Sequence, residues 1–202
     1  MVRRLSRTPN LLRTYGDILT DYEARGFIER VDAGQPSDHT HYIPHHPVMK
    51  DSSTTPVRIV FDCSCRQNPN SPSLNDCLDV GPPFLNDLCA IILRFQTYRY
   101  GFSTDIEKAF LHVGLPEYDR DFTRFLWLSD ATDPESAFQT YRFKVVLFGS
   151  TSSPFMLNAT LHSHLANYES PIAKDIKNDL YVDNFISGRD IEETLEYYNE
   201  SR

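Results

Sequence analysis

Apolar residues recur along this chain at two spacings, one typical of helices and one typical of strands. The helical spacing follows Pro9, Pro83 and Pro154, and proline is favoured in the first turn of a helix, where its missing N–H group has no helical partner. We predict four helices: from Thr8-Pro9 to a stop at Gly26; from Pro82-Pro83, with Leu85, Leu88, Ile92 and Phe95 on one face; from Ser153-Pro154, with Leu157, Leu161, Leu165 and Tyr168 buried; and from Asp190 to Tyr198.

Shorter apolar and alternating runs predict the strands. Near the C-terminus two such runs are separated only by Asp183-Asn184. Asp and Asn tolerate the left-handed torsions of a two-residue hairpin loop, so we place the turn there. The expected strands are residues 27–31, 57–62, 100–105, 122–128 and 138–146, together with hairpin arms at 180–182 and 185–187.

Two carboxylates stand where predicted strands end. Asp105 closes the strand 100–105, and a side chain there projects from a rigid element, as a metal ligand must. Asp183 would lie at the tip of the hairpin, with the amide of Asn184 beside it. Each also has an ordinary explanation, because Asp105 could cap the following helix and Asp183-Asn184 could form only a turn.

Two cations flank a polar stretch in the first half of the chain. Lys50 precedes this stretch and Arg58 follows it, within the strand 57–62. A strand-turn-strand hairpin would bring them together as a phosphate clamp, with Lys as a point charge and Arg as a bidentate fork. The alternative is a pair of solvated surface charges. Four nearby histidines lack regular ligand spacing, which favours a structural or surface role for His39, His41, His45 and His46.

Composition narrows the class of protein. The 202 residues, 40% of them hydrophobic, suit one large domain or two small lobes. No apolar run is long enough for a bilayer, so we expect no membrane association and an intracellular, cytoplasmic protein, with the nucleus as an alternative. The net charge of −8 does not by itself favour nucleic-acid binding. The four cysteines lack zinc-site spacing, and we expect reduced thiols.

Taken together, the motifs resemble the reverse transcriptase domain of a BEL/Pao-class LTR retrotransposon polyprotein. The resemblance extends from about residue 11 to the end of the sequence, and its motifs follow the family's order and approximate spacing. It is carried by residues 42–48 (YIPHHPV), 57–62 (VRIVFD), 104–110 (TDIEKAF), 148–155 (FGSTSSPF) and 181–184 (YVDN).

This resemblance implies an α+β fold with the fingers-and-palm architecture of polymerases. The palm would be an antiparallel sheet backed by helices, and the thumb would be missing. Residues 1–100 would form an N-terminal helix and fingers region. Residues 101–202 would form the palm region with the catalytic hairpin, and the whole would be one continuous domain truncated at its C-terminus.

The resemblance also implies the activity and its site. An RNA-directed DNA polymerase joins dNTPs to a primer 3′-hydroxyl with two Mg²⁺ ions, for which Mn²⁺ can substitute. The catalytic residues would be Asp105, Asp183 and Asn184, which would bind the metal with the carbonyl of Ile106. Most members have Asp where this chain has Asn184, so a divalent ion would be held more weakly. The dNTP-binding residues would be Lys50, Arg58, Phe110, Phe148 and Gly149, with Phe110 excluding a 2′-hydroxyl.

The implied partners are an RNA or DNA template with its primer, dNTPs, and other domains of the polyprotein, namely thumb, RNase H, integrase and protease. Two alternatives remain open. The first is a catalytically inactive nucleic-acid-binding relic, whose binding would not depend on Asp105 or Asp183. The second is a structural or protein-interaction domain without polymerase ancestry, in which these two carboxylates would lie far apart.

Overall fold

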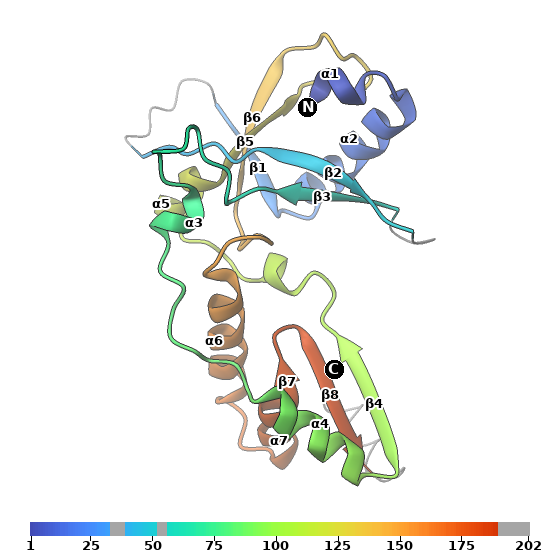
Figure 1. Ribbon diagram of the computed structural model, residues 1–202, viewed down its shortest axis with the longest axis vertical. Coiled ribbons are helices and arrows are strands. Elements are labelled where there is room, and N and C mark those ends of the chain that lie inside the picture. Colours follow the sequence, from blue (N-terminus) through green and yellow to red (C-terminus); the bar gives the residue numbers. More distant parts are fainter. Residues whose placement is uncertain (33–38, 52–55, 190–202) are drawn as a thin grey trace. The chain divides into compact units, whose positions relative to one another are not determined.

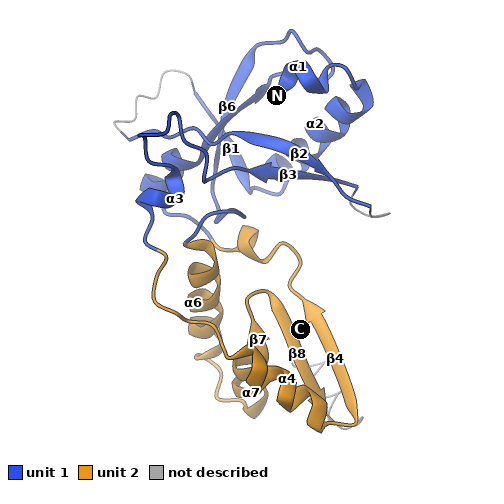
Figure 2. Cartoon of the chain, in the orientation of Figure 1, with its two compact units in different colours: residues 1–79, 114–151 blue, residues 80–113, 152–202 orange. Residues whose placement is uncertain are grey.

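The computed structural model describes residues 1–32, 39–51 and 56–189. The chain forms two compact units that interleave along the sequence: unit 1 comprises residues 1–79 and 114–151, and unit 2 comprises residues 80–113 and 152–202 (Figure 2). Both contain helices and small antiparallel sheets, as an α+β fold requires. The expected division between residues 100 and 101 follows the family resemblance and stays a prediction.

Unit 1 contains a three-stranded antiparallel sheet in the order β1-β6-β5 and a separate two-stranded sheet, β2-β3. The helix predicted from Pro9 is α2, and Gly26, at φ 75°, follows its end. The elements of this unit are α1 (Val2–Leu5), α2 (Pro9–Ala24), β1 (Ile28–Val31), β2 (His45–Met49), β3 (Val57–Phe61), α3 (Leu74–Cys77), α5 (Glu117–Arg120), η2 (Asp121–Thr123), β5 (Arg124–Leu128) and β6 (Phe138–Phe143).

The core of unit 1 is aromatic and contains one histidine. His45 is 7% exposed and stacks on Phe61. Its Nε2–H donates to the carbonyl of Leu126 at 2.9 Å, and its Nδ1 accepts a hydrogen bond from the hydroxyl of Tyr15. The imidazole therefore joins α2, β2 and β5, which is a structural role.

Unit 2 is built on one antiparallel sheet in the order β4-β8-β7. Helices α4 and α7 pack against its central strand, β8 (Figure 1). The elements are α4 (Leu88–Thr97), β4 (Tyr100–Asp105), η1 (Ala109–His112), α6 (Ser153–Leu165), α7 (Pro171–Asp179), β7 (Leu180–Tyr181) and β8 (Asn184–Arg189).

The helix predicted from Pro82-Pro83 begins later than expected. Asp87 is the N-cap of α4, and its side chain accepts hydrogen bonds from the amides of Cys89 and Ala90. The expected apolar stripe is wrong as well, because Ile91 is the buried residue of this helix whereas Leu85, Leu88 and Ile92 are exposed.

The helix predicted from Ser153-Pro154 is α6, with Ser152 as its N-cap. Of its expected buried stripe only Leu157 is fully buried, and Tyr168, which lies beyond the helix, is 55% exposed. The helix expected at 190–198 lies outside the described residues. Among the residues described, no helix has both the length and the apolar character needed to cross a membrane.

Candidate metal and nucleotide site

The C-terminal hairpin forms as predicted, but its turn lies one residue earlier. Tyr181 pairs with Asn184, so the turn consists of Val182 and Asp183. The predicted turn at Asp183-Asn184 is wrong because Asn184 also pairs with Asp105 of β4, which makes it the first residue of β8. Val182 consequently has φ 57°, a torsion that a β-branched residue rarely adopts.

Strand register brings Asp105 to this turn. Asp105 is the last residue of β4 and lies directly opposite Asn184. The next amide, that of Ile106, donates a hydrogen bond of 2.9 Å to the carbonyl of Asp183. Opposite residues of an antiparallel pair have Cα atoms about 4.5–5.5 Å apart. The two aspartates therefore occupy adjoining positions at one end of one sheet.

The side chains at this end of the sheet share a face. Asp105 and Asn184 project to the same side because they lie directly opposite each other. The Nδ2 of Asn184 donates to Oδ1 of Asp183 at 3.0 Å, which holds the Asp183 carboxylate near that side. Within the described ranges, the carboxylate of Asp105 makes no hydrogen bond or ion pair, and that of Asp183 is bonded only to Asn184.

This donor set fits a hard divalent cation. Magnesium prefers oxygen ligands, and the strand register brings two residues with carboxylate side chains to adjoining positions. The Ile106 carbonyl accepts one hydrogen bond, of 3.2 Å from the Ala109 amide, and a carbonyl oxygen retains a second lone pair. The described residues contain no group of three or more His, Cys, Asp or Glu suited to a metal, and here only Asp105 and Asp183 belong to those types.

The segment after Asp105 excludes the capping explanation for this residue. The helical turn η1 has Lys108 as its N-cap, with φ 52° and no side-chain capping bond. Phe110 lies in η1 and is 8% exposed, so most of its ring is buried.

The two cations lie on the β2-β3 hairpin, as the sequence predicts. Arg58 lies opposite Val48, and the amide of Lys50 donates to the carbonyl of Pro56 at 2.8 Å, which continues the pairing beyond β2. Lys50 and Arg58 are therefore diagonal neighbours on one face. Both are exposed. Burial raises the pKa of Tyr22 in α2, and the nearby charge of Arg58 partly opposes that rise.

The loop before α6 requires glycine. Gly149 has φ 98°, and a Cβ atom there would lie 3.0 Å from the carbonyl oxygen of Phe61. The preceding Phe148 is 47% exposed. Asn75, which sequence reasoning missed, holds this loop: its Nδ2 donates to the Gly149 carbonyl at 3.0 Å, and its Oδ1 accepts from the Thr151 amide at 2.9 Å.

The expected site residues are divided between the two units. The nucleotide-contacting candidates of unit 1 lie on the β2-β3 hairpin and in the loop before α6, whereas the metal-binding candidates lie together in unit 2. Unit 1 holds Lys50, Arg58, Phe148 and Gly149, and unit 2 holds Asp105, Ile106, Phe110, Asp183 and Asn184.

Comparison of the chain with models of known protein families gives no match. Comparison with curated proteins gives no match either.

Proposed function

We propose that this chain carries the catalytic centre of an RNA-directed DNA polymerase, as a fragment of a retrotransposon polyprotein. One observation supports this most strongly. Asp105 and Asp183, far apart in sequence, lie at adjoining positions because Asp105 pairs with Asn184 and the Ile106 amide binds the Asp183 carbonyl. Nucleotidyl transfer by two divalent cations needs carboxylates that both cations can share.

The chain's own residues have distinct parts in this proposal. The carboxylates of Asp105 and Asp183, assisted by the oxygens of Asn184 and Ile106, hold Mg²⁺ or Mn²⁺. Such ions, when bound, activate the primer 3′-hydroxyl and neutralise charge on the leaving pyrophosphate. Neither carboxylate forms an ion pair within the described residues, which is consistent with this use.

The remaining candidates would bind the incoming nucleotide. Lys50 and Arg58, diagonal neighbours on an exposed hairpin face, would hold phosphate oxygens. Phe110 would exclude a 2′-hydroxyl and so favour dNTPs over ribonucleotides. Phe148 and Gly149 would contact the base and sugar, because the glycine lets the nucleotide approach the backbone closely.

Single-nucleotide addition to a primed RNA template tests this proposal. The unchanged chain, at high concentration with Mg²⁺ or Mn²⁺, is expected to add the complementary dNTP. Asp105→Ala and Asp183→Ala should each slow addition by at least about a hundredfold, because each removes a ligand for the charge-neutralising cations. Gel electrophoresis of a labelled primer measures the rate.

Glu169→Ala is the matched control, since Glu169 is an exposed carboxylate of the same unit with no interaction among the described residues. It should retain the full rate. Addition that persists in Asp183→Ala would contradict the proposal. Primer–template binding without addition by the unchanged chain would favour the inactive relic instead.

A further inference from the structure

The hairpin that carries Asp183 is tied to the helices behind it by a buried carboxylate. Asp179 ends α7 immediately before β7, and its side chain is 7% exposed. The Ser187 hydroxyl of β8 donates to its Oδ2 at 2.6 Å, and Nε of Arg94 from α4 donates to its Oδ1 at 3.0 Å. We call Arg94, Asp179 and Ser187 the hairpin anchor.

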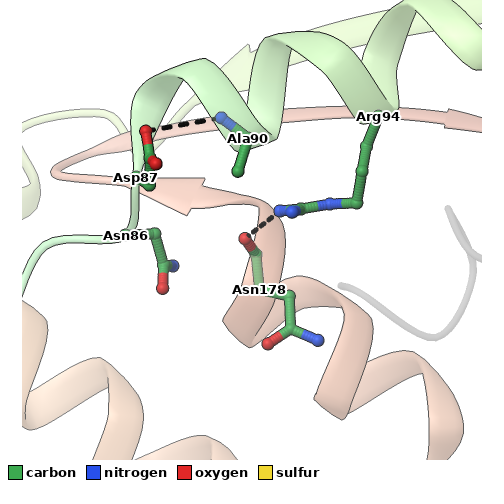
Figure 3. A pocket seen from close by; sticks show the side chains of 5 residues that line it. All are labelled: Asn86, Asp87, Ala90, Arg94 and Asn178. Carbon is green, nitrogen blue, oxygen red and sulfur yellow. Dashed lines mark hydrogen bonds between the residues drawn. The ribbon is translucent and has the colours of Figure 1, made fainter.

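Arg94 of α4 and Asn86, which lies just before that helix, also bind the backbone around the start of β7. An Nη2–H of Arg94 donates to the Asn178 carbonyl at 2.6 Å. The side-chain amide of Asn86 donates to the carbonyls of Lys177 and Leu180, at 2.7 and 2.9 Å. The last carbonyls of a helix have no partner within it, so these bonds fix the end of α7. Figure 3 shows Arg94 reaching from α4 to Asn178 beside a polar pocket lined by Asn86, Asp87, Ala90, Arg94 and Asn178.

The hairpin needs such external support. Strand β7 has only two residues, Leu180 and Tyr181, so it has few backbone hydrogen bonds of its own to set the register. Asp179 lies just before this strand, whereas Ser187 lies in β8 and pairs with Phe102 of β4, the strand that ends in Asp105. The Asp179–Ser187 hydrogen bond thus joins the two arms on either side of the Val182-Asp183 turn.

From this geometry we propose that Arg94, Asp179 and Ser187 are positioning residues for the Asp183 carboxylate. They fix the register of the hairpin against β4, so that Asp183 stays beside Asp105. Arg94 balances the charge of the buried Asp179, which allows a charged acceptor to hold Ser187. An effect of these residues on nucleotide addition rests on the proposed function. Their effect on the register of the hairpin against β4 does not depend on it.

Ser187→Ala in the whole chain tests the anchor with the smallest change, because it removes one hydroxyl and leaves the Arg94–Asp179 pair intact. Ile91→Val is the matched control: Ile91 is the buried residue of α4, and losing one methylene loosens the same unit without removing any hydrogen bond of the anchor. Three quantities are compared well below the melting temperature: the rate of single-nucleotide addition, the half-saturating Mn²⁺ concentration, and hydrogen exchange at the Ile106 amide, which binds the Asp183 carbonyl.

Ser187→Ala is expected to slow addition about tenfold, since small misplacements of reacting groups have effects of that order or larger. It should also raise the half-saturating Mn²⁺ concentration severalfold and accelerate Ile106 exchange, while Ile91→Val leaves all three near those of the unchanged chain. If Ser187→Ala and Ile91→Val gave equal values of these three quantities, the positioning role of the hairpin anchor would be overturned.

Failure of the proposed function is recognised separately. If the unchanged chain adds no nucleotide, the polymerase proposal fails, and Ile106 exchange still decides the role of the anchor. Faster exchange in Ser187→Ala than in Ile91→Val then supports the anchor, and equal exchange overturns it.

Discussion

At the scale of single residues, the hairpin turn combines a strained backbone with a carboxylate that lacks a cationic partner among the described residues. Val182 at φ 57° costs conformational energy, and such torsions persist where the surrounding structure imposes them. Here the Ile106–Asp183 bond and the pairing of Asn184 with both neighbouring strands impose it. The strained residue, Val182, thus directly precedes Asp183, which we propose as a metal ligand.

A second residue, His45, makes the stability of unit 1 depend on pH. Burial lowers the pKa of His45 from 6.5 to about 4. Its two ring nitrogens are committed to the Leu126 carbonyl and the Tyr15 hydroxyl, and burial raises the pKa of Tyr15, which stays a neutral donor. Between these pH values the unfolded chain binds a proton that the folded chain does not, so stability decreases as the pH falls.

We predict a loss of about 3 kcal/mol of unfolding free energy between pH 6.5 and 4 from His45 alone, the span over which its pKa is lowered. Urea denaturation at a series of pH values measures it. His45→Gln should flatten this dependence because glutamine does not titrate, whereas His46→Gln, on the same strand but less buried, should leave it in place. If the unfolding free energy changed equally with pH in both variants, the attribution of this dependence to His45 would be contradicted.

At the scale of elements, local patterns located most strands and two helix starts correctly. Helices α2 and α6 follow Thr8-Pro9 and Ser153-Pro154, where proline marks the first turn. The same signal at Ser170-Pro171 marks α7 and was missed, although Ser170 caps that helix. The start of α4 was misjudged because the capping carboxylate of Asp87, rather than the Pro82-Pro83 pair, determines it.

Long-range pairing explains why the site was only partly predictable. The sequence singled out Asp105, Asp183, Lys50 and Arg58 as candidates and placed each near the end of a strand or hairpin, where the structure also has them. It could not place the turn at Val182-Asp183, because that depends on pairing between residues 105 and 184. It also gave no reason to choose Asn75 or Asp179. Asn75 binds Gly149 and Thr151, and Asp179 binds Arg94 and Ser187, and these partners come together only in the folded chain.

The pairing of β4 with β8 leads to a prediction for Asn184→Asp. This change places a second carboxylate directly opposite Asp105 and removes the amide that donates to Asp183. Like charges at opposite positions destabilise a sheet, so without divalent ions we expect a loss of about 1 kcal/mol. With Mg²⁺ the added charge should instead strengthen metal binding, so the increase in melting temperature on adding Mg²⁺ should exceed that of the unchanged chain.

Thermal unfolding in EDTA and in Mg²⁺ measures both effects. Asn167→Asp supplies the matched control, because Asn167 is an exposed residue of the same unit that follows α6. It adds the same charge without a carboxylate opposite. A Mg²⁺ response in Asn184→Asp no larger than in Asn167→Asp would show that residue 184 does not contribute to a cation site.

At the scale of the whole molecule, the residues that we propose for the chemistry are divided between the two units. The candidate carboxylates lie in unit 2, on a sheet whose central strand contacts α4 and α7, and the candidate cations and the glycine loop lie in unit 1. The proposed chemistry requires above all that Asp105 and Asp183 bind the same divalent cations.

Mn²⁺ binding by the whole chain, followed by electron paramagnetic resonance of free Mn²⁺, tests that claim most directly. Asp105→Asn and Asp183→Asn are each expected to weaken binding about tenfold or more, and the double variant should bind little more weakly than either single one, because the two residues act on one site. Glu169→Gln should bind as the unchanged chain does. Wild-type affinity in either single aspartate variant, or effects that simply add in the double variant, would contradict a shared site.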